Sequence, residues 1–263
     1  MQHGNKSKKM KKIFSVFYLL VLILGCKEEK DFELESLTEK PPVVISENGP
    51  EIFQYWEFER SRYLFSEDLG EISYLRAYKD SIADELGPSV LKDILDNQRI
   101  QSSLGIVEGN PDGLSNFELI HKNQIGEVRD LNYLEAELLN YQASRFPLFS
   151  QPTEFHGFVL INVDRDLVRV YFGANDQPWP PKPKPIIAHV EEALEKGWKL
   201  MYHLHNHYEE PSNGYIGAMA PSLADVHYFK VLVKRFGLQK ALITNGFTTL
   251  VLPAAEFDKL NSH

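Results

Sequence analysis

The alternation of helix-like and strand-like segments in the second half of the chain constrains its fold most strongly. Residues 131–143 have the apolar spacing of an amphipathic helix. The segments that follow read, in order, as strands at 158–163 and 167–172, a helix at 186–196, a strand at 198–202, a helix at 222–236 and two strands within 241–252. This order predicts a small α/β domain with a mixed sheet.

The region before this domain has a different pattern. Residues 26–50 are polar and contain a Pro-Pro pair, which predicts a tether. Residues 51–112 predict a mainly helical region, including a helix that ends at Gly87. We expect the dense aromatic residues of this region to pack in a core, with sugar stacking as the alternative. Asn110-Pro111-Asp112-Gly113 is a turn signal, so we place a boundary there and assign 113–263 to the α/β domain.

The N-terminus predicts export and lipid anchoring. Lys11 and Lys12 precede an apolar run, 13–24, which is too short to cross a bilayer as a helix and fits the core of a signal peptide. The run leads into Gly25-Cys26, which resembles a bacterial lipobox. We therefore expect 1–25 to be a signal peptide and Cys26 to carry a lipid. A membrane-anchor helix beside a chance cysteine is the alternative, and translation from Met10 would leave out residues 1–9.

A lipid on Cys26 would anchor the protein in a bacterial cell envelope, at the outer membrane. The charged run 27–31 resembles the tag that sends some Bacteroidetes lipoproteins to the cell surface, and an ordinary solvated linker is the alternative. The leader holds five lysines and no acids, so without it 23 basic residues face 37 acidic ones, a formal charge of −14. This charge disfavours nucleic acid as a partner. The sequence leaves the oligomeric state open.

Three alternate histidines, His203, His205 and His207, are the densest chemical signal in the chain. In a strand, alternate side chains point to the same face, so two of these imidazoles can bind one metal ion from one side. Zinc usually takes such nitrogens with a carboxylate and keeps one position for water. A run of surface histidines is the alternative. Among ligand pairs, His203 with His205 is the alternative to His205 with His207.

Two further motifs flank the histidines in the sequence. Ser222 and Asp225 have the spacing of a capping box, which starts a helix and also fixes the direction of the carboxylate. Glu154 stands just before an apolar strand, in which Gly157 permits close backbone approach. A helix start and a solvated loop charge are the alternative interpretations of these motifs.

Taken together, the three motifs resemble the JAMM (JAB/MPN) zinc metallopeptidase family, and its RadC-like branch in particular. The family pattern is Glu-x-x-Gly before an apolar strand, then His-x-His-Pro, then Ser-x-x-Asp. The matching residues lie in the same order within about 125–253: Glu154, Gly157, His205, Asn206, His207, Ser222 and Asp225. The resemblance implies a three-layer JAB/MPN-like fold with a mixed sheet.

The resemblance also implies a role for each matched polar residue. His205, His207 and Asp225 would hold Zn²⁺, which lowers the pKa of a bound water toward about 7. Glu154 would take a proton from that water and later pass it to the leaving amine. Ser222 would donate a hydrogen bond to the oxyanion. The implied reaction is hydrolysis of a peptide or isopeptide bond in a peptide or protein substrate.

The sequence departs from the family pattern after the histidines. Tyr208 stands where the family has proline, and 14 residues separate His207 from Ser222, about twice the family's usual spacing. The longer loop would lie beside the metal, where it could shape or cover a substrate cleft. A non-catalytic JAB/MPN scaffold and a metal- or sugar-binding surface lipoprotein are the alternative functions. Four other histidines stand outside any motif and are expected to be structural: His121, His156, His189 and His227.

Overall fold

In the computed structural model, residues 35–263 form one compact unit. The structure describes residues 37, 39–67, 73–89, 92, 111–147, 151–207, 217 and 220–262. The expected leader, Cys26, the charged run 27–31 and most of the loop from Tyr208 to Pro221 lie outside the described residues. Across the described residues, none of the helices has both the length and the apolar character that crossing a bilayer requires.

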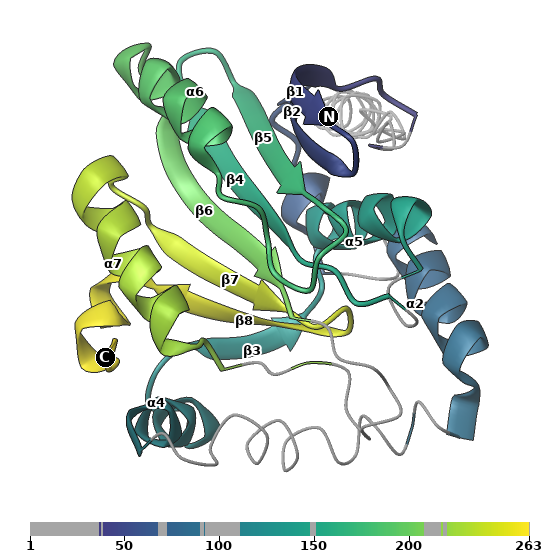
Figure 1. Cartoon of the computed structure of the whole chain (residues 1–263), viewed down its shortest axis with the longest axis vertical. Coiled ribbons are helices and arrows are strands. Elements are labelled where there is room, and N and C mark those ends of the chain that lie inside the picture. Colours follow the sequence, from purple (N-terminus) through teal and green to yellow (C-terminus); the bar gives the residue numbers. More distant parts are fainter. Residues whose placement is uncertain are drawn as a thin grey trace, which may run out of the picture. The chain divides into compact units, whose positions relative to one another are not determined.

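An eight-stranded mixed sheet is the centre of this unit (Figure 1). The strands lie in the order β1-β2-β5-β4-β6-β7-β8-β3. Among the described strands, β6 and β7 pair in parallel and all other neighbours are antiparallel. The bounds are β1 Val43–Asn48, β2 Glu51–Glu59, β3 Glu127–Asp130, β4 Phe155–Asn162, β5 Leu167–Ala174, β6 Lys199–Asn206, β7 Lys240–Thr244 and β8 Thr248–Pro253.

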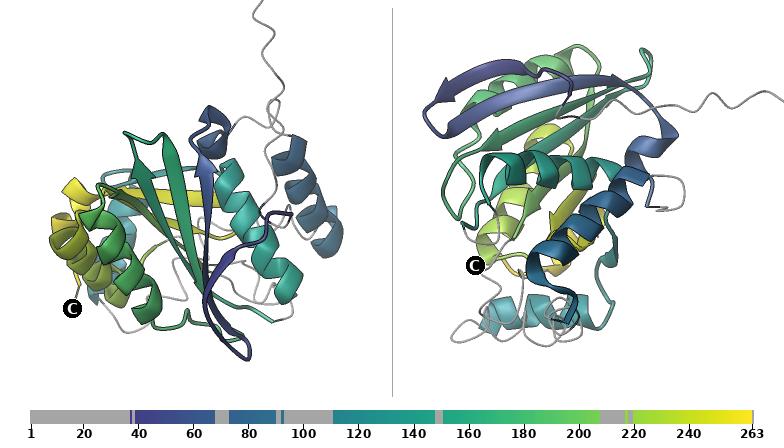
Figure 2. Two further views of the ribbon diagram at one scale, coloured as in Figure 1. Left: turned by 90° about the horizontal axis from the view of Figure 1, so that it is seen from above. Right: turned by 90° about the vertical axis from the view of Figure 1, so that its right-hand side faces the viewer.

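Helices cover both faces of the sheet (Figure 2). One face carries α6 (Lys184–Glu195) and α7 (Leu223–Phe236), and the opposite face carries α5 (Tyr133–Arg145) and α2 (Ser73–Leu86). The structure also describes helix α4 (Pro111–His121) and the 3-10 helices η1 (Arg62–Phe65) and η3 (Ala254–Lys259). The mixed sheet between layers of helices confirms the predicted α/β class.

The helices and strands that the sequence predicts after residue 130 are present, with ends shifted by a few residues. Local signals account for this agreement. Asn132 and Glu135 form a capping box that starts α5. Gly237 ends α7 in the left-handed conformation, at a φ of 68°, which glycine adopts without a steric penalty. Strand β3 was not predicted, because its four residues are mostly charged, as is common in edge strands.

Before residue 113, the predicted tether and helical region are wrong in part. Strand β1 lies inside the expected tether, and β2 lies inside the region expected to be helical. β2 pairs with β5 along nearly its whole length, from Ile52 opposite Ala174 to Glu59 opposite Leu167. Its aromatic-rich sequence fits a pleated sheet better than a helix, because side chains on both faces find packing partners. The helix expected to end at Gly87 is confirmed as α2.

The turn expected at Asn110-Pro111-Asp112-Gly113 is also wrong, because Pro111 is the first residue of helix α4. Proline is favoured at that position, where its missing N–H would have no helical partner, and Asp112 in the first turn suits the helix dipole. The Asn116 side chain then exchanges two hydrogen bonds of 2.7 Å with the backbone of Asn261. These bonds connect α4 to the C-terminal end of the same compact unit.

We expect Trp56→Ala to lower the free energy of unfolding by about 3 to 5 kcal/mol, because it empties a large site in the core. Trp56 is 1% exposed and packs edge-on against Tyr141 and Phe172, with ring centroids 5.1 and 6.1 Å away. Trp179, which is 61% exposed, provides the control, and Trp179→Ala should change stability by less than about 0.5 kcal/mol. Urea unfolding followed by circular dichroism measures both. Equal effects would contradict the place of β2 in the core.

Candidate metal centre

Strand β6 carries the predicted histidines to one end of the sheet. It lies between β4 and β7, and His205 and Asn206 are its last two residues. His207 follows immediately, and its backbone N–H donates to the Thr244 carbonyl at 2.8 Å. The backbone of His207 is therefore held against β7 just beyond the end of the strand.

The N-terminus of α7 brings the acidic residue to the same place. Ser222 is the N-cap, and its Oγ accepts from the Asp225 N–H at 3.1 Å. The Asp225 carboxylate in turn accepts from the Ser222 N–H at 2.8 Å and from the Ser222 Oγ at 2.7 Å. The predicted capping box is thus confirmed, and it fixes the direction of the Asp225 side chain.

The side chains of His205, His207 and Asp225 converge. The two Nε2 atoms lie 3.0 Å apart. One Asp225 oxygen is 3.5 Å from Nε2 of His205, and the other is 3.6 Å from Nε2 of His207. One potential ligand atom from each residue lies within 4.8 Å of the other two. Among the described residues, this is the one group of three or more such side chains that could hold a metal ion.

The charge states of these groups suit a cation. Burial lowers the pKa of His205, and the nearby Asp225 carboxylate offsets this only in part, so the imidazole is neutral at neutral pH. Burial alone would raise the pKa of Asp225, but the facing imidazoles of His205 and His207 lower it well below its usual range. Two imidazole nitrogens and one carboxylate are a donor set that zinc takes in hydrolytic sites. The residues therefore fit a zinc ion.

His203 is not part of this group. Its Nε2 lies 3.0 Å from Nδ1 of His156, on the neighbouring strand β4. Burial lowers the pKa of both, that of His156 to about 3, so a single N–H···N hydrogen bond between neutral rings accounts for the contact. The Tyr228 ring of α7 stands edge-on to His203, with centroids 5.3 Å apart. The contact with His156 could not be predicted from the sequence, because it depends on the register between two strands.

The remaining predicted residues are not among the three that converge. Glu154 is half-buried, directly precedes β4 and is not one of the three converging residues. The hydroxyl proton of Ser222 is used by Asp225, so Ser222 would have to rotate before it could serve an oxyanion. Asn206, between the two converging histidines, is fully buried, and the sequence had assigned it no role.

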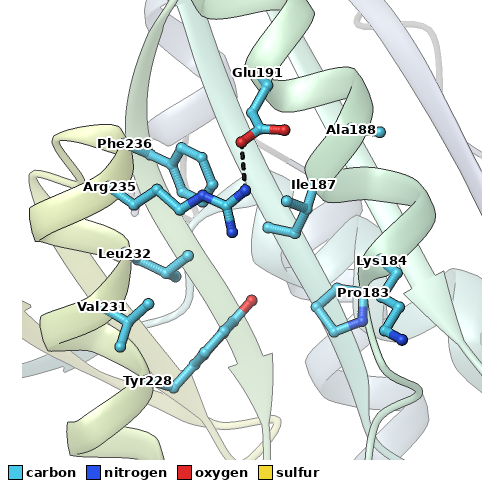
Figure 3. Close-up of a pocket in the computed structure, with 10 residues that line it drawn as sticks. All are labelled: Pro183, Lys184, Ile187, Ala188, Glu191, Tyr228, Val231, Leu232, Arg235 and Phe236. Atoms are coloured by element: carbon cyan, nitrogen blue, oxygen red, sulfur yellow. Dashed lines mark hydrogen bonds and ion pairs between the residues drawn. The ribbon is translucent and has the colours of Figure 1, made fainter.

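A groove of about 360 Å³ lies between α6 and α7 (Figure 3). Tyr228 lines the groove, and the same ring contacts His156 and His203. At the α6 side the groove is lined by Pro183 and Lys184, which are the N-cap and the first residue of this helix. The groove thus begins one helical turn after Asp225.

No protein-family model, curated protein or solved structure matches this chain. The function of the centre is therefore inferred from its own residues and their geometry.

We expect the purified protein to carry about one zinc ion per chain, as single-site hydrolases do. His205→Ala and His207→Ala should each abolish zinc binding, because each removes one of three protein ligands. His203→Ala is the matched control: it removes a buried histidine of the same strand and should at most weaken binding. Metal content by mass spectrometry and zinc titration measure these effects. Loss of zinc in His203→Ala with retention in His207→Ala would shift the ligand pair back by two residues.

Proposed function

We propose that this protein is a zinc-dependent hydrolase of peptide or isopeptide bonds, related to the JAMM (JAB/MPN) metallopeptidases. The convergence of His205, His207 and Asp225 carries the proposal. The three residues come from the end of a central strand and from the first turn of the next helix, in the order of the family's motifs. The eight-stranded mixed sheet between helical layers is consistent with a JAB/MPN-like fold.

The pairing of β4 with β6 supports the role of Glu154. His156 is opposite His205 in the last pair of this ladder, and two further residues in the same register would bring Glu154 opposite His207. Directly opposed residues of antiparallel strands project their side chains to the same face of the sheet. Glu154 would therefore share a face with both histidine ligands, as a proton acceptor beside the metal must.

Each residue of the proposed active site would have a separate role. His205, His207 and Asp225 would hold the ion, and Glu154 would take a proton from the attacking water and pass it to the leaving amine. When bound, zinc would supply Lewis acidity and lower the pKa of a water ligand to about 7. Ser222 would donate to the developing oxyanion after its hydroxyl turns away from Asp225.

We expect Glu154→Gln to bind zinc normally and to lose about 100-fold or more of the hydrolysis rate, the usual contribution of general acid–base catalysis. Glutamine keeps the size of the side chain but cannot accept the proton. Asp225→Asn should instead lose zinc affinity together with rate. A peptide library provides the substrate, and zinc content is measured on the same samples.

The control for Glu154→Gln is Glu195→Gln, which makes the same change at an exposed position near the end of α6. It should keep both zinc and rate. If Glu154→Gln cleaves the substrate as fast as the parent protein, its role as proton acceptor is wrong. A zinc-loaded parent that cleaves no member of the library would favour the non-catalytic scaffold.

We also propose that a lipid on Cys26 anchors the protein in the bacterial outer membrane. This proposal rests on the lipobox-like sequence alone. Cys26→Ser should remove the acylation site and move the protein from the membrane fraction to the soluble fraction. Cell fractionation with an alkaline wash and labelling with a fatty acid measure the change. A Cys26→Ser protein that remains in washed membranes would contradict the lipid anchor and favour the membrane-anchor helix.

A further inference from the structure

We propose that Asn206 is a positioning residue, which holds the segment around Glu154 in a fixed place beside the two histidine ligands. The inference rests on the proposed role of Glu154 as proton acceptor. It concerns a residue that makes no contact with the reacting atoms and acts through Glu154.

The Asn206 side chain binds the peptide groups on both sides of Glu154. Its Oδ1 accepts from the Phe155 N–H at 2.9 Å, and its Nδ2 donates to the Thr153 carbonyl at 2.8 Å. Asn206 and Thr153 are completely buried, so water does not compete for these bonds. Loss of these bonds would leave two buried peptide groups unpaired, which is unfavourable.

An amide is the side chain that fits this position. One bond requires an acceptor and the other requires a donor, and the two ends of the asparagine amide supply one each. A flipped amide would face Oδ1 toward the Thr153 carbonyl and Nδ2 toward the Phe155 N–H, so the orientation is determined. A carboxylate of the same size would keep the acceptor but would repel the Thr153 carbonyl.

Other contacts hold the same segment from different sides. The Glu154 N–H donates to the Gln177 carbonyl at 3.3 Å, and Gln142 Nε2 donates to Thr153 Oγ1 at 2.8 Å. Asn206 alone among these partners lies between the two proposed ligands in the sequence. It therefore links the backbone that carries Glu154 to the strand end that carries His205 and His207.

This link has a consequence for the reaction. A proton acceptor must lie within about 3 Å of the proton it takes, and a displacement of about 1 Å can reduce a rate by about 100-fold. Without the Asn206 bonds, the Glu154 segment can shift relative to the ligands while the ligands stay in place. The expected effect is a loss of rate with zinc retained.

The test uses the detergent-solubilised full chain and a double-mutant cycle. Asn206→Ala should keep zinc and lower kcat by about 10- to 100-fold with KM little changed, since binding groups on the substrate are untouched. In a Glu154→Gln background the same substitution should lower kcat by less than about twofold, because contacting residues that act through one another give non-additive effects. Asn206→Asp, which keeps the size of the side chain and one of its two hydrogen bonds, should also lower kcat and keep the fold.

A second readout needs no substrate. The visible absorption spectrum of the Co²⁺-substituted protein reports the coordination of the ion and the groups hydrogen-bonded to its ligands. Asn206→Ala should change this spectrum in the same way as Glu154→Gln, and the double variant should add no further change. Asn162→Ala is the matched control: Asn162 is also buried, and its Oδ1 accepts from the Arg165 N–H at the opposite end of β4.

The outcomes separate this inference from the proposed function. Equal losses of kcat from Asn206→Ala in both backgrounds, or a loss from Asn162→Ala as large, would show a purely structural role and overturn the inference. So would a Co²⁺ spectrum that Glu154→Gln changes and neither Asn206→Ala nor Asn206→Asp changes. A parent protein that binds no metal, or a Glu154→Gln variant with full activity, would instead overturn the proposed function.

Discussion

The antiparallel pairing of β4 with β6 is the constraint on which the candidate centre depends. It places His203 and His205 on the face covered by α7, and a slip of one residue would turn both toward α5. The register shifts once, between Val159 and Leu160. Because of this irregularity, Leu200 reaches the same core as His203, although an unbroken strand would point them to opposite faces. The irregularity thus lets β6 contribute both to the apolar core and to the polar end of that face.

A helix or strand could be predicted from the sequence where interactions between residues close in the chain determine it. α7 could be predicted because its start, at Ser222, and its end, at Gly237, are set within a few residues. β2 was misread because its aromatic-rich sequence has no clear period, and its conformation is decided by pairing with β5, more than 100 residues away. At Pro111 the same local signal suits both a turn and the start of a helix, so the sequence alone does not decide between them. The hydrogen bonds between Asn116 and Asn261 join that helix to the rest of the fold.

The same distinction applies to the candidate centre. His205, His207 and Asp225 could be named from the sequence, since strand alternation and a capping box determine where such side chains point. The bonds from Asn206 to the Glu154 segment join residues about 50 positions apart. No spacing rule predicts them, because they require the register of β4 against β6 to be known. His156 was expected to be only structural for the same reason. Its contact with His203 also depends on the register of β4 against β6.

Burial of the histidines links the stability of this fold to its proposed chemistry. The Phe229 ring lies 5.7 and 5.8 Å from the rings of His203 and His205, in a face that is otherwise apolar core. Taking imidazoles out of water is unfavourable, and Nδ1 of His205 has no hydrogen-bond partner among the described residues. Yet the same desolvation lowers the pKa of His205 and favours its neutral ring, in which one nitrogen keeps the lone pair that a metal ligand needs. A core chosen for stability alone would exclude such a polar cluster, and the proposed metal site gives its buried nitrogens a role.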